Sequence, residues 1–403
     1  DSAVTYLARM LAEPLSDEQR PGTLLQLGMA EAGTGGADAE EHLLAAYRSL
    51  GDPTSRGIAA YALARRLLFV GEAQRAADLA AEARLEVPEG EDIAEVVESA
   101  ELLSIYFGAR VDDAEERFRE LRTLPEEPSG GQSVLCAAAS YDWAYRGGSS
   151  AECAALASVS MERASQMEFD TGLSWIIANV VLATADRPEA MEMWDRALAR
   201  SHKQGGMFGV MTVHLWRGFA HLRYGDLQDA EESLRAGIEQ ITLLGGATLD
   251  YAHGFLAETL MEQGHVDEAV EALNRIARPQ GFGDGALLWR VAEIELMLET
   301  GRAEEALEAA RVHAADCGWR TNPAFAPSRT LQARALQALG RTDEAIEVMR
   351  EELAAAETWG ADGTVGRALR ILGEIRQQQG LEDLDRAIEL LEGSPMKLDL
   401  AKA

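Results

Sequence analysis

A motif that returns every 37 to 40 residues constrains the fold of this chain more than any other feature of its sequence. Each clear copy has a glycine and, five residues later, an alanine, as in Gly225 with Ala230 and Gly264 with Ala269. Self-similarity at this spacing is typical of repeat architectures, in which each unit buries its apolar face against its neighbours. The sequence therefore predicts one continuous array over residues 1–403 instead of several compact domains.

The register of this motif extends over the whole chain and gives ten turn positions. Alanine stands five residues after the turn in seven of the ten copies, although it makes up only 69 of the 403 residues, so that chance would give fewer than two. The predicted turn residues are Thr34, Gly71, Gly108, Gly148, Ala185, Gly225, Gly264, Gly301, Gly340 and Gly380.

Each copy has the features of a hairpin of two helices. Glycine readily adopts the left-handed conformation that ends a first helix, and the acidic residue that soon follows favours the positive end of a second helix. The small alanine lets the two helices pack closely. Because strong helix formers dominate the composition and long alternating β-branched stretches are missing, we predict an all-α solenoid of about ten hairpins.

The two ends of the sequence fall inside repeats. Ala3 lies 36 residues before Ala39, so the chain begins on the second helix of a hairpin. Ser394 and Pro395 open a new first helix that would have to continue beyond Ala403. Because natural solenoids close with polar capping repeats, we expect a fragment of a longer protein, cut within a repeat at both ends.

The formal net charge of −31, from 68 acidic and 37 basic residues, disfavours direct contact with nucleic acid or a membrane. Solubility of a glutamate-rich surface is the simplest explanation, and a basic partner is the alternative. Cys136, Cys153 and Cys317 form no CxxC pair, as is typical of buried thiols in a reducing compartment. The longest apolar stretch, at residues 173–185, is too short to span a bilayer, so we expect a cytoplasmic protein.

The sequence lacks the motifs of common catalytic and metal sites. It contains no GxxxxGK[ST] phosphate loop, no HExxH, no GxSxG and no EF-hand loop. The segment Gly281–Gly285 superficially resembles a dinucleotide-binding loop, but it follows a helical pattern instead of a strand and fits a link between repeats. His214, His221 and His253 are dispersed, which favours ordinary packing over a metal site. We therefore predict no enzymatic activity, no cofactor and no metal.

The repeat resembles the tetratricopeptide family, at a period longer than is usual there. The resemblance implies a right-handed superhelix whose first helices line a concave face, with exposed positions at fixed offsets before each turn. In the hairpin of Gly225, for example, Phe219 and Arg223 lie 6 and 2 residues before the turn. The ligand- or partner-binding residues predicted in this way are Arg65, Asp142, Tyr145, Arg146, Trp175, Asn179, Phe219, Arg223, Tyr251 and Glu258.

Aromatic residues interleaved with arginine, asparagine and carboxylates suit a groove for a polar ligand or a peptide. The middle hairpins have the densest mixture, in which Trp175 and Phe219 offer apolar contact while Arg146 and Arg223 would meet an anionic or carbonyl group. The alternative is that several of these aromatic residues belong to the core between helices. The late hairpins offer polar residues without aromatic ones: Thr330, Arg334, Gln337, Arg370 and Gln378.

Two segments resemble a narrower group of proteins. Residues 1–32 and the ending Leu391–Ala401 look like the helical region of large ATP-binding LuxR-type transcriptional regulators, the maltose-regulator-like proteins of high-GC bacteria. The resemblance implies a signal-sensing region that passes effector binding to an ATPase module and a helix-turn-helix, both absent from this chain. The implied partner is a small-molecule effector, or a protein or peptide, in the concave groove, with self-association of the full-length protein.

Two other functions also fit the sequence. A plain tetratricopeptide adaptor would take a peptide or a protein in its concave groove without any small-molecule effector. A similar repeat region could instead serve another signalling output, such as a nucleotide cyclase or a kinase.

Overall fold

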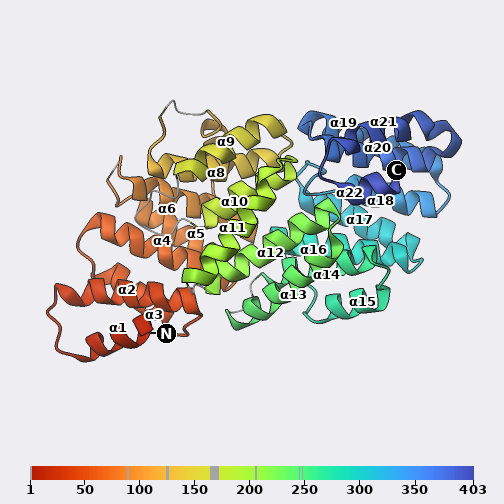
Figure 1. Ribbon diagram of the computed structural model, residues 1–403. Coiled ribbons are helices and arrows are strands. Elements are labelled where there is room, and N and C mark those ends of the chain that lie inside the picture. The colour runs from red at the N-terminus through yellow and green to blue at the C-terminus, as the bar shows by residue number, and fades with distance from the viewer. Residues whose placement is uncertain are drawn as a thin grey trace.

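The computed structural model is helical and describes residues 2–88, 90–123, 127–163, 172–204, 207–244, 246 and 248–403. Over these residues the chain forms no strand, and ten helical hairpins follow one another as predicted (Figure 1). The predicted all-α solenoid is therefore confirmed. In the same part of the chain no helix is both long and apolar enough to cross a membrane.

Each hairpin consists of a first helix and a second helix, and the second helix lies on the outer side of the first. The first helices are α2 (Gln19–Thr34), α4 (Pro53–Phe69), α6 (Asp92–Leu103), α8 (Gly130–Tyr145), α10 (Gly172–Thr184), α12 (Met207–Tyr224), α14 (Leu249–Glu262), α16 (Asp284–Glu299), α18 (Ser328–Ala338) and α20 (Asp362–Arg376). The second helices are α3 (Ala39–Ser49), α5 (Ala73–Arg84), α7 (Ala114–Glu120), α9 (Ser150–Arg163), α11 (Glu189–Gln204), α13 (Leu227–Leu243), α15 (Val266–Asn274), α17 (Ala303–Cys317), α19 (Thr342–Trp359) and α21 (Leu381–Glu392). Helix α1 (Ser2–Ala12) precedes them, α22 (Lys397–Lys402) follows them, and short 3₁₀ helices occur at Ser104–Phe107 and Gln377–Gly380.

Most of the predicted turn residues have the left-handed backbone that ends a first helix. Six glycines have φ between 73° and 97°: Gly71, Gly108, Gly225, Gly264, Gly301 and Gly340. In three other copies the left-handed residue is the one next to the predicted Thr34, Gly148 or Ala185, namely Gly35, Gly147 or Asp186. These three predictions are wrong by one position, because the helix runs one residue longer or shorter than the average register.

The prediction of a left-handed turn at Gly380 is wrong. Its φ is −98°, and the positive φ of this hairpin, 54°, belongs to Gln377. Glycine is needed at position 380 for space, because a Cβ atom there would lie 2.3 Å from the carbonyl oxygen of Gly373. The same residue type thus serves close backbone packing in this copy and helix termination in the others.

The alanine of the motif holds each hairpin together. All seven alanines at the predicted position are fully buried: Ala39, Ala76, Ala190, Ala230, Ala269, Ala306 and Ala345. Larger residues four positions further on, such as Trp194 and Leu234, are also fully buried and fill the space between helices. Side chains at these two positions therefore explain why the motif repeats.

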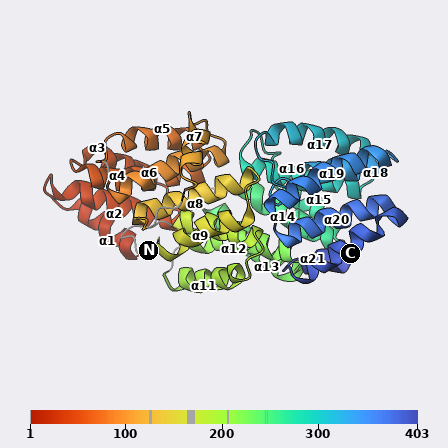
Figure 2. The same cartoon turned by 90° about the horizontal axis from the view of Figure 1, so that it is seen from above.

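The array winds so tightly that its successive turns touch. Arg66 Nη1 donates to the carbonyl oxygen of Leu244 at 3.3 Å, and Asn322 Nδ2 donates to that of Ala144 at 2.8 Å, across 178 residues in both cases. Figures 1 and 2 show α1 to α6 at one end of the molecule and the helices from α17 at the other, with α10 to α14 between them. Tight winding brings the first helices close together, which decides how much of the concave face stays open.

Candidate functional site

The structure buries most of the predicted binding residues. Six of the ten have side chains in the interior: Arg65, Asp142, Tyr145, Asn179, Arg223 and Tyr251. The other four are partly exposed: Arg146, Trp175, Phe219 and Glu258. An open groove was expected along the middle hairpins, but contact between superhelical turns closes part of it, and the six buried residues pack inside the protein.

Asp142 anchors a polar cluster inside the N-terminal half. Its carboxylate accepts hydrogen bonds from Tyr106 Oη at 3.1 Å and from Arg146 Nε at 3.0 Å. Burial raises the pKa of Asp142, and the neighbouring Arg146 acts against that rise. The Arg146 guanidinium also lies 4.3 Å from the ring centre of Trp319. Arg146 thus contacts the next turn of the superhelix through Trp319, while Asp142 holds Arg146 and Tyr106 within its own turn.

The segment 318–327, between α17 and α18, closes the interior next to this cluster. The backbone amides of Thr321 and Asn322 donate to the carbonyl oxygen of Tyr145, at 3.0 and 3.2 Å. The Phe325 ring stacks on that of Tyr145 with centres 4.3 Å apart. Tyr145 is therefore a docking point for this segment and not part of an open surface, and nothing in the sequence pattern indicated the partnership.

Three further predicted residues hold neighbouring helices together. Asn179 Nδ2 donates to the carbonyl oxygen of Ala190 at 3.1 Å, which ties α10 to α11. The Trp175 ring meets that of Trp194 edge-on at 5.2 Å. Tyr251 packs against Trp216, with ring centres 5.5 Å apart. The alternative interpretation of these aromatic positions, as core between helices, is the one that the structure supports.

Two predicted arginines are also built into the interior. The Arg65 guanidinium lies 5.1 Å from the ring centre of Phe208. Arg223 Nη2 donates to Thr364 Oγ1 at 2.9 Å and to the carbonyl oxygen of Thr184 at 3.2 Å. Burial lowers the pKa of Arg223. Arg223 therefore joins α12 to the hairpins of α10 and α20, and its predicted role of meeting an anionic ligand conflicts with these contacts.

In the C-terminal half the concave face opens into a chamber of about 270 Å³. First helices α12, α14, α16, α18 and α20 surround it, together with α22 and the segment 318–327. The predicted residues that line it are Phe219, Arg223, Glu258, Thr330, Arg334, Gln337 and Arg370. The densest open mixture of aromatic and charged residues is therefore displaced from the middle hairpins toward the C-terminus.

An aromatic and aliphatic wall covers one part of the chamber. Phe219 of α12 and Phe255 of α14 lie with their ring centres 4.9 Å apart, and Phe325 contributes from the segment 318–327. Leu288 and Val291 of α16 extend this wall. Apolar contact of this kind gives most of the affinity of a ligand pocket, while a few polar groups set its orientation.

Ion pairs also line the chamber. Asp399 of α22 accepts from Arg367 at 2.8 Å and from Arg370 at 2.9 Å, and these two guanidinium groups lower its pKa to about 2. Arg334 pairs with Glu295 at 3.2 Å. The chamber is thus strongly charged, but its charges largely compensate one another.

The sequence contained more of this chamber than the predicted list. The offsets that give Phe219 and Arg223 from Gly225 give Glu295 and Glu299 from Gly301, and both of these line the chamber. Asp399 and Lys402 of α22 could not be found in this way, because no turn residue follows them in the chain.

In the predicted link Gly281–Gly285, residues Gly281–Gly283 connect two repeats and Asp284 and Gly285 begin α16. Gly283 precedes α16, and a Cβ atom on it would lie 3.1 Å from the carbonyl carbon of Phe107. Close approach of two backbones therefore explains the glycine. Among the described residues no group of histidine, cysteine and carboxylate side chains is arranged to hold a metal ion. The three cysteines are buried free thiols, as predicted.

Solved structures with the same arrangement of helices define the class of fold. A crystal structure of Rap protein complexed with competence and sporulation factor matches with a TM-score of 0.60 at 13% identity, over 87% of this chain and 99% of that chain. The APC/C hetero-tetramer Cut9–Hcn1 matches with a TM-score of 0.51 at 12% identity, over 98% of this chain and 83% of that chain. No protein-family model matches the sequence, and no curated protein does. The chain therefore has the fold of a tetratricopeptide-type helical repeat.

Proposed function

We propose that this chain is a non-enzymatic binding module whose C-terminal chamber takes a peptide or a segment of a partner protein. The observation that carries the proposal is the chamber itself, which is lined by the aromatic wall of Phe219 and Phe255 and by a set of charged side chains. Its volume is near the lower end of the range for ligand pockets, which suits a chain end or a few side chains. The matching Rap protein was crystallised with a bound factor, and Cut9 with Hcn1, which supports a binding role for this fold.

Selection from a random dodecapeptide library displayed on phage tests this proposal. Peptides selected on the chain are then measured against Leu222→Trp, which fills part of the chamber, and against Leu85→Trp, the same exchange at an exposed leucine of the N-terminal half. We expect the larger side chain at position 222 to weaken binding by about 10-fold or more, since it takes up the space of the ligand. Equal affinity for both variants, with unchanged thermal unfolding, would place the binding surface elsewhere.

Within this function, we propose the narrower role that the sequence resemblance implies: the signal-sensing region of a LuxR-type transcriptional regulator in the bacterial cytoplasm. Its support is the similarity of residues 1–32 and Leu391–Ala401 to that group. The structural neighbours fit a plain peptide- or protein-binding adaptor at least as well. The gene on either side decides between the two: a phosphate-loop motif upstream and a helix-turn-helix downstream support the regulator, and their absence supports the adaptor.

A further inference from the structure

The charged side chains that line the chamber do not all have a hydrogen-bond or ion-pair partner among the described residues. Five basic and six acidic residues line it. Every basic one is already held by the protein: Arg223 by Thr364, Arg334 by Glu295, Arg367 and Arg370 by Asp399, and Lys402 by Glu262. Among the acidic ones Glu258 differs, because it makes no hydrogen bond or ion pair with any residue that the structure describes. Among the charged groups that line the chamber, the carboxylate of Glu258 is therefore available for a ligand, whereas every basic group already binds another residue.

The surroundings of Glu258 are those of a site for a cation. It lies one helical turn from Phe255 on α14, whose ring packs beside that of Phe219. The carboxylates of Glu262 and Glu295 lie near enough to act on its charge, and burial together with Glu295 raises the pKa of Glu258 well above its usual range. Arg367 acts against this rise, but Asp399 already holds its guanidinium group. A positive charge entering beside Glu258 would relieve this repulsion.

We infer that the chamber takes a positively charged group of the partner, a lysine or arginine side chain or an amine, with Glu258 as its ion-pair partner and Phe219 and Phe255 as the wall on which it packs. The inference rests on the proposed function and names the chemistry of its ligand. A guanidinium or ammonium over an aromatic face is attracted by the ring, and its alkyl stem covers apolar surface. An anionic group would have to break an existing ion pair, for example that of Arg367 with Asp399.

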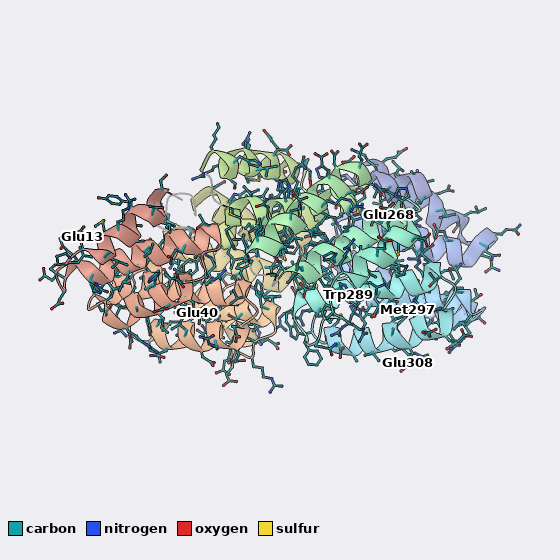
Figure 3. The ribbon with its side chains drawn as sticks, turned by 90° about the horizontal axis from the view of Figure 1, so that it is seen from below. Glu13, Glu40, Glu268, Trp289, Met297 and Glu308 are labelled. Atoms are coloured by element: carbon teal, nitrogen blue, oxygen red, sulfur yellow. The ribbon has the colours of Figure 1, made fainter. Side chains whose placement is uncertain are left out.

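The net charge of the chain favours the same ligand. At −31 it attracts basic peptides over long distances and speeds their encounter. Long-range attraction is unspecific, since carboxylates such as Glu268 and Glu308 cover the outer helices as well (Figure 3). Specificity has to come from a place where a carboxylate, an aromatic wall and restricted space coincide. Glu258 in the chamber is such a place.

The peptides selected in the experiment above test this inference. Each arginine is replaced by citrulline and each lysine by norleucine, which removes the charge and preserves most of the shape. We expect one basic residue whose neutralisation weakens binding by about 10-fold or more. Glu258→Gln should weaken binding of the unmodified peptide to the same extent, and combining the two changes should add little. Glu308→Gln, an exchange on the exposed edge of α17 (Figure 3), should bind like the unchanged chain.

The outcomes separate the inference from the proposed function. If Leu222→Trp weakens peptide binding but neither citrulline nor Glu258→Gln changes the affinity, the chamber binds peptides and the cation site is refuted. If no peptide senses Leu222→Trp, the proposed function fails. In that event titration with n-butylguanidinium, followed by nuclear magnetic resonance, still tests the site: saturable binding that Glu258→Gln abolishes supports it, and no binding overturns it. Unchanged thermal unfolding of Glu258→Gln shows that a loss of binding is not a loss of folding.

Discussion

Asn322 is the residue at which the closure of the superhelix can be tested with the least disturbance. Its side chain is fully buried, its Nδ2 donates to the carbonyl oxygen of Ala144 at 2.8 Å, and its Oδ1 accepts from the backbone amide of Ala324 at 2.9 Å. The first bond joins two turns of the superhelix, and the second shapes the segment 318–327. Asn322→Ala removes both bonds while it leaves the backbone free to keep its conformation.

The expected cost follows from what each partner loses. The carbonyl oxygen of Ala144 still accepts from the amide of Gly147 at 3.1 Å, so its loss is an ordinary hydrogen bond, about 0.5–1.5 kcal/mol. The amide of Ala324 is buried and has the Asn322 side chain as its acceptor, so it is left unsatisfied at a cost of about 1–3 kcal/mol. We therefore expect Asn322→Ala to lower the free energy of unfolding by about 1.5–4.5 kcal/mol.

Urea unfolding followed by circular dichroism measures this change, and Asn274→Ala serves as the control, since Asn274 is exposed at the end of α15. The control exchange should stay within about 0.5 kcal/mol of the unchanged chain. Hydrogen exchange of the segment 318–327 should also become faster in Asn322→Ala. If both substitutions lower the free energy of unfolding by the same small amount, and the amides of the segment 318–327 exchange no faster, the contact between turns does not stabilise the fold.

Two further outcomes follow from single residues. Burial lowers the pKa of His313 to about 4; because the unfolded chain takes up this proton at about pH 6.5, stability should fall by up to about 3 kcal/mol between pH 6.5 and 4. His313→Gln should remove that part of the pH dependence of urea unfolding, and an unchanged pH profile would contradict the assignment. Gly71 and Gly225 have nearly the same φ, 85° and 88°, but a Cβ atom on Gly225 would lie 2.6 Å from that of Leu398, whereas one on Gly71 meets nothing within 4 Å. Gly71→Ala should lower the free energy of unfolding by about 1–2 kcal/mol, which is the cost of the left-handed backbone alone. Gly225→Ala should lower it by about 1–3 kcal/mol more, because the new Cβ atom meets Leu398. Equal losses in urea unfolding would show that α22 can move away from the new side chain at no cost.

The hairpins were predictable because their signals are local. The turn glycine and the alanine five residues later act within one hairpin, so their spacing in the sequence is their spacing in space. Errors arose where one residue type serves two purposes. In the sequence Gly380 resembles the other turn glycines. In the structure its backbone is not left-handed, and glycine is required there because a Cβ atom would clash with Gly373.

The closure of the concave face was not predictable in the same way. How tightly a solenoid winds depends on small rotations between successive hairpins, and these add up over several repeats. Contacts such as that of Tyr145 with Phe325 join residues far apart in the sequence and leave no periodic signal. The offsets from the turn residues therefore located the inward-facing positions, as Glu258 shows, but could not tell an open chamber from a filled core.

A crystal structure of the chain with one of the selected peptides would show whether the chamber is the binding site. We expect the peptide in the chamber between α14 and α20, with a lysine, arginine or amine nitrogen within hydrogen-bond distance of the Glu258 carboxylate and its stem against Phe255. A peptide bound to the outer second helices, with nothing in the chamber, would contradict this expectation.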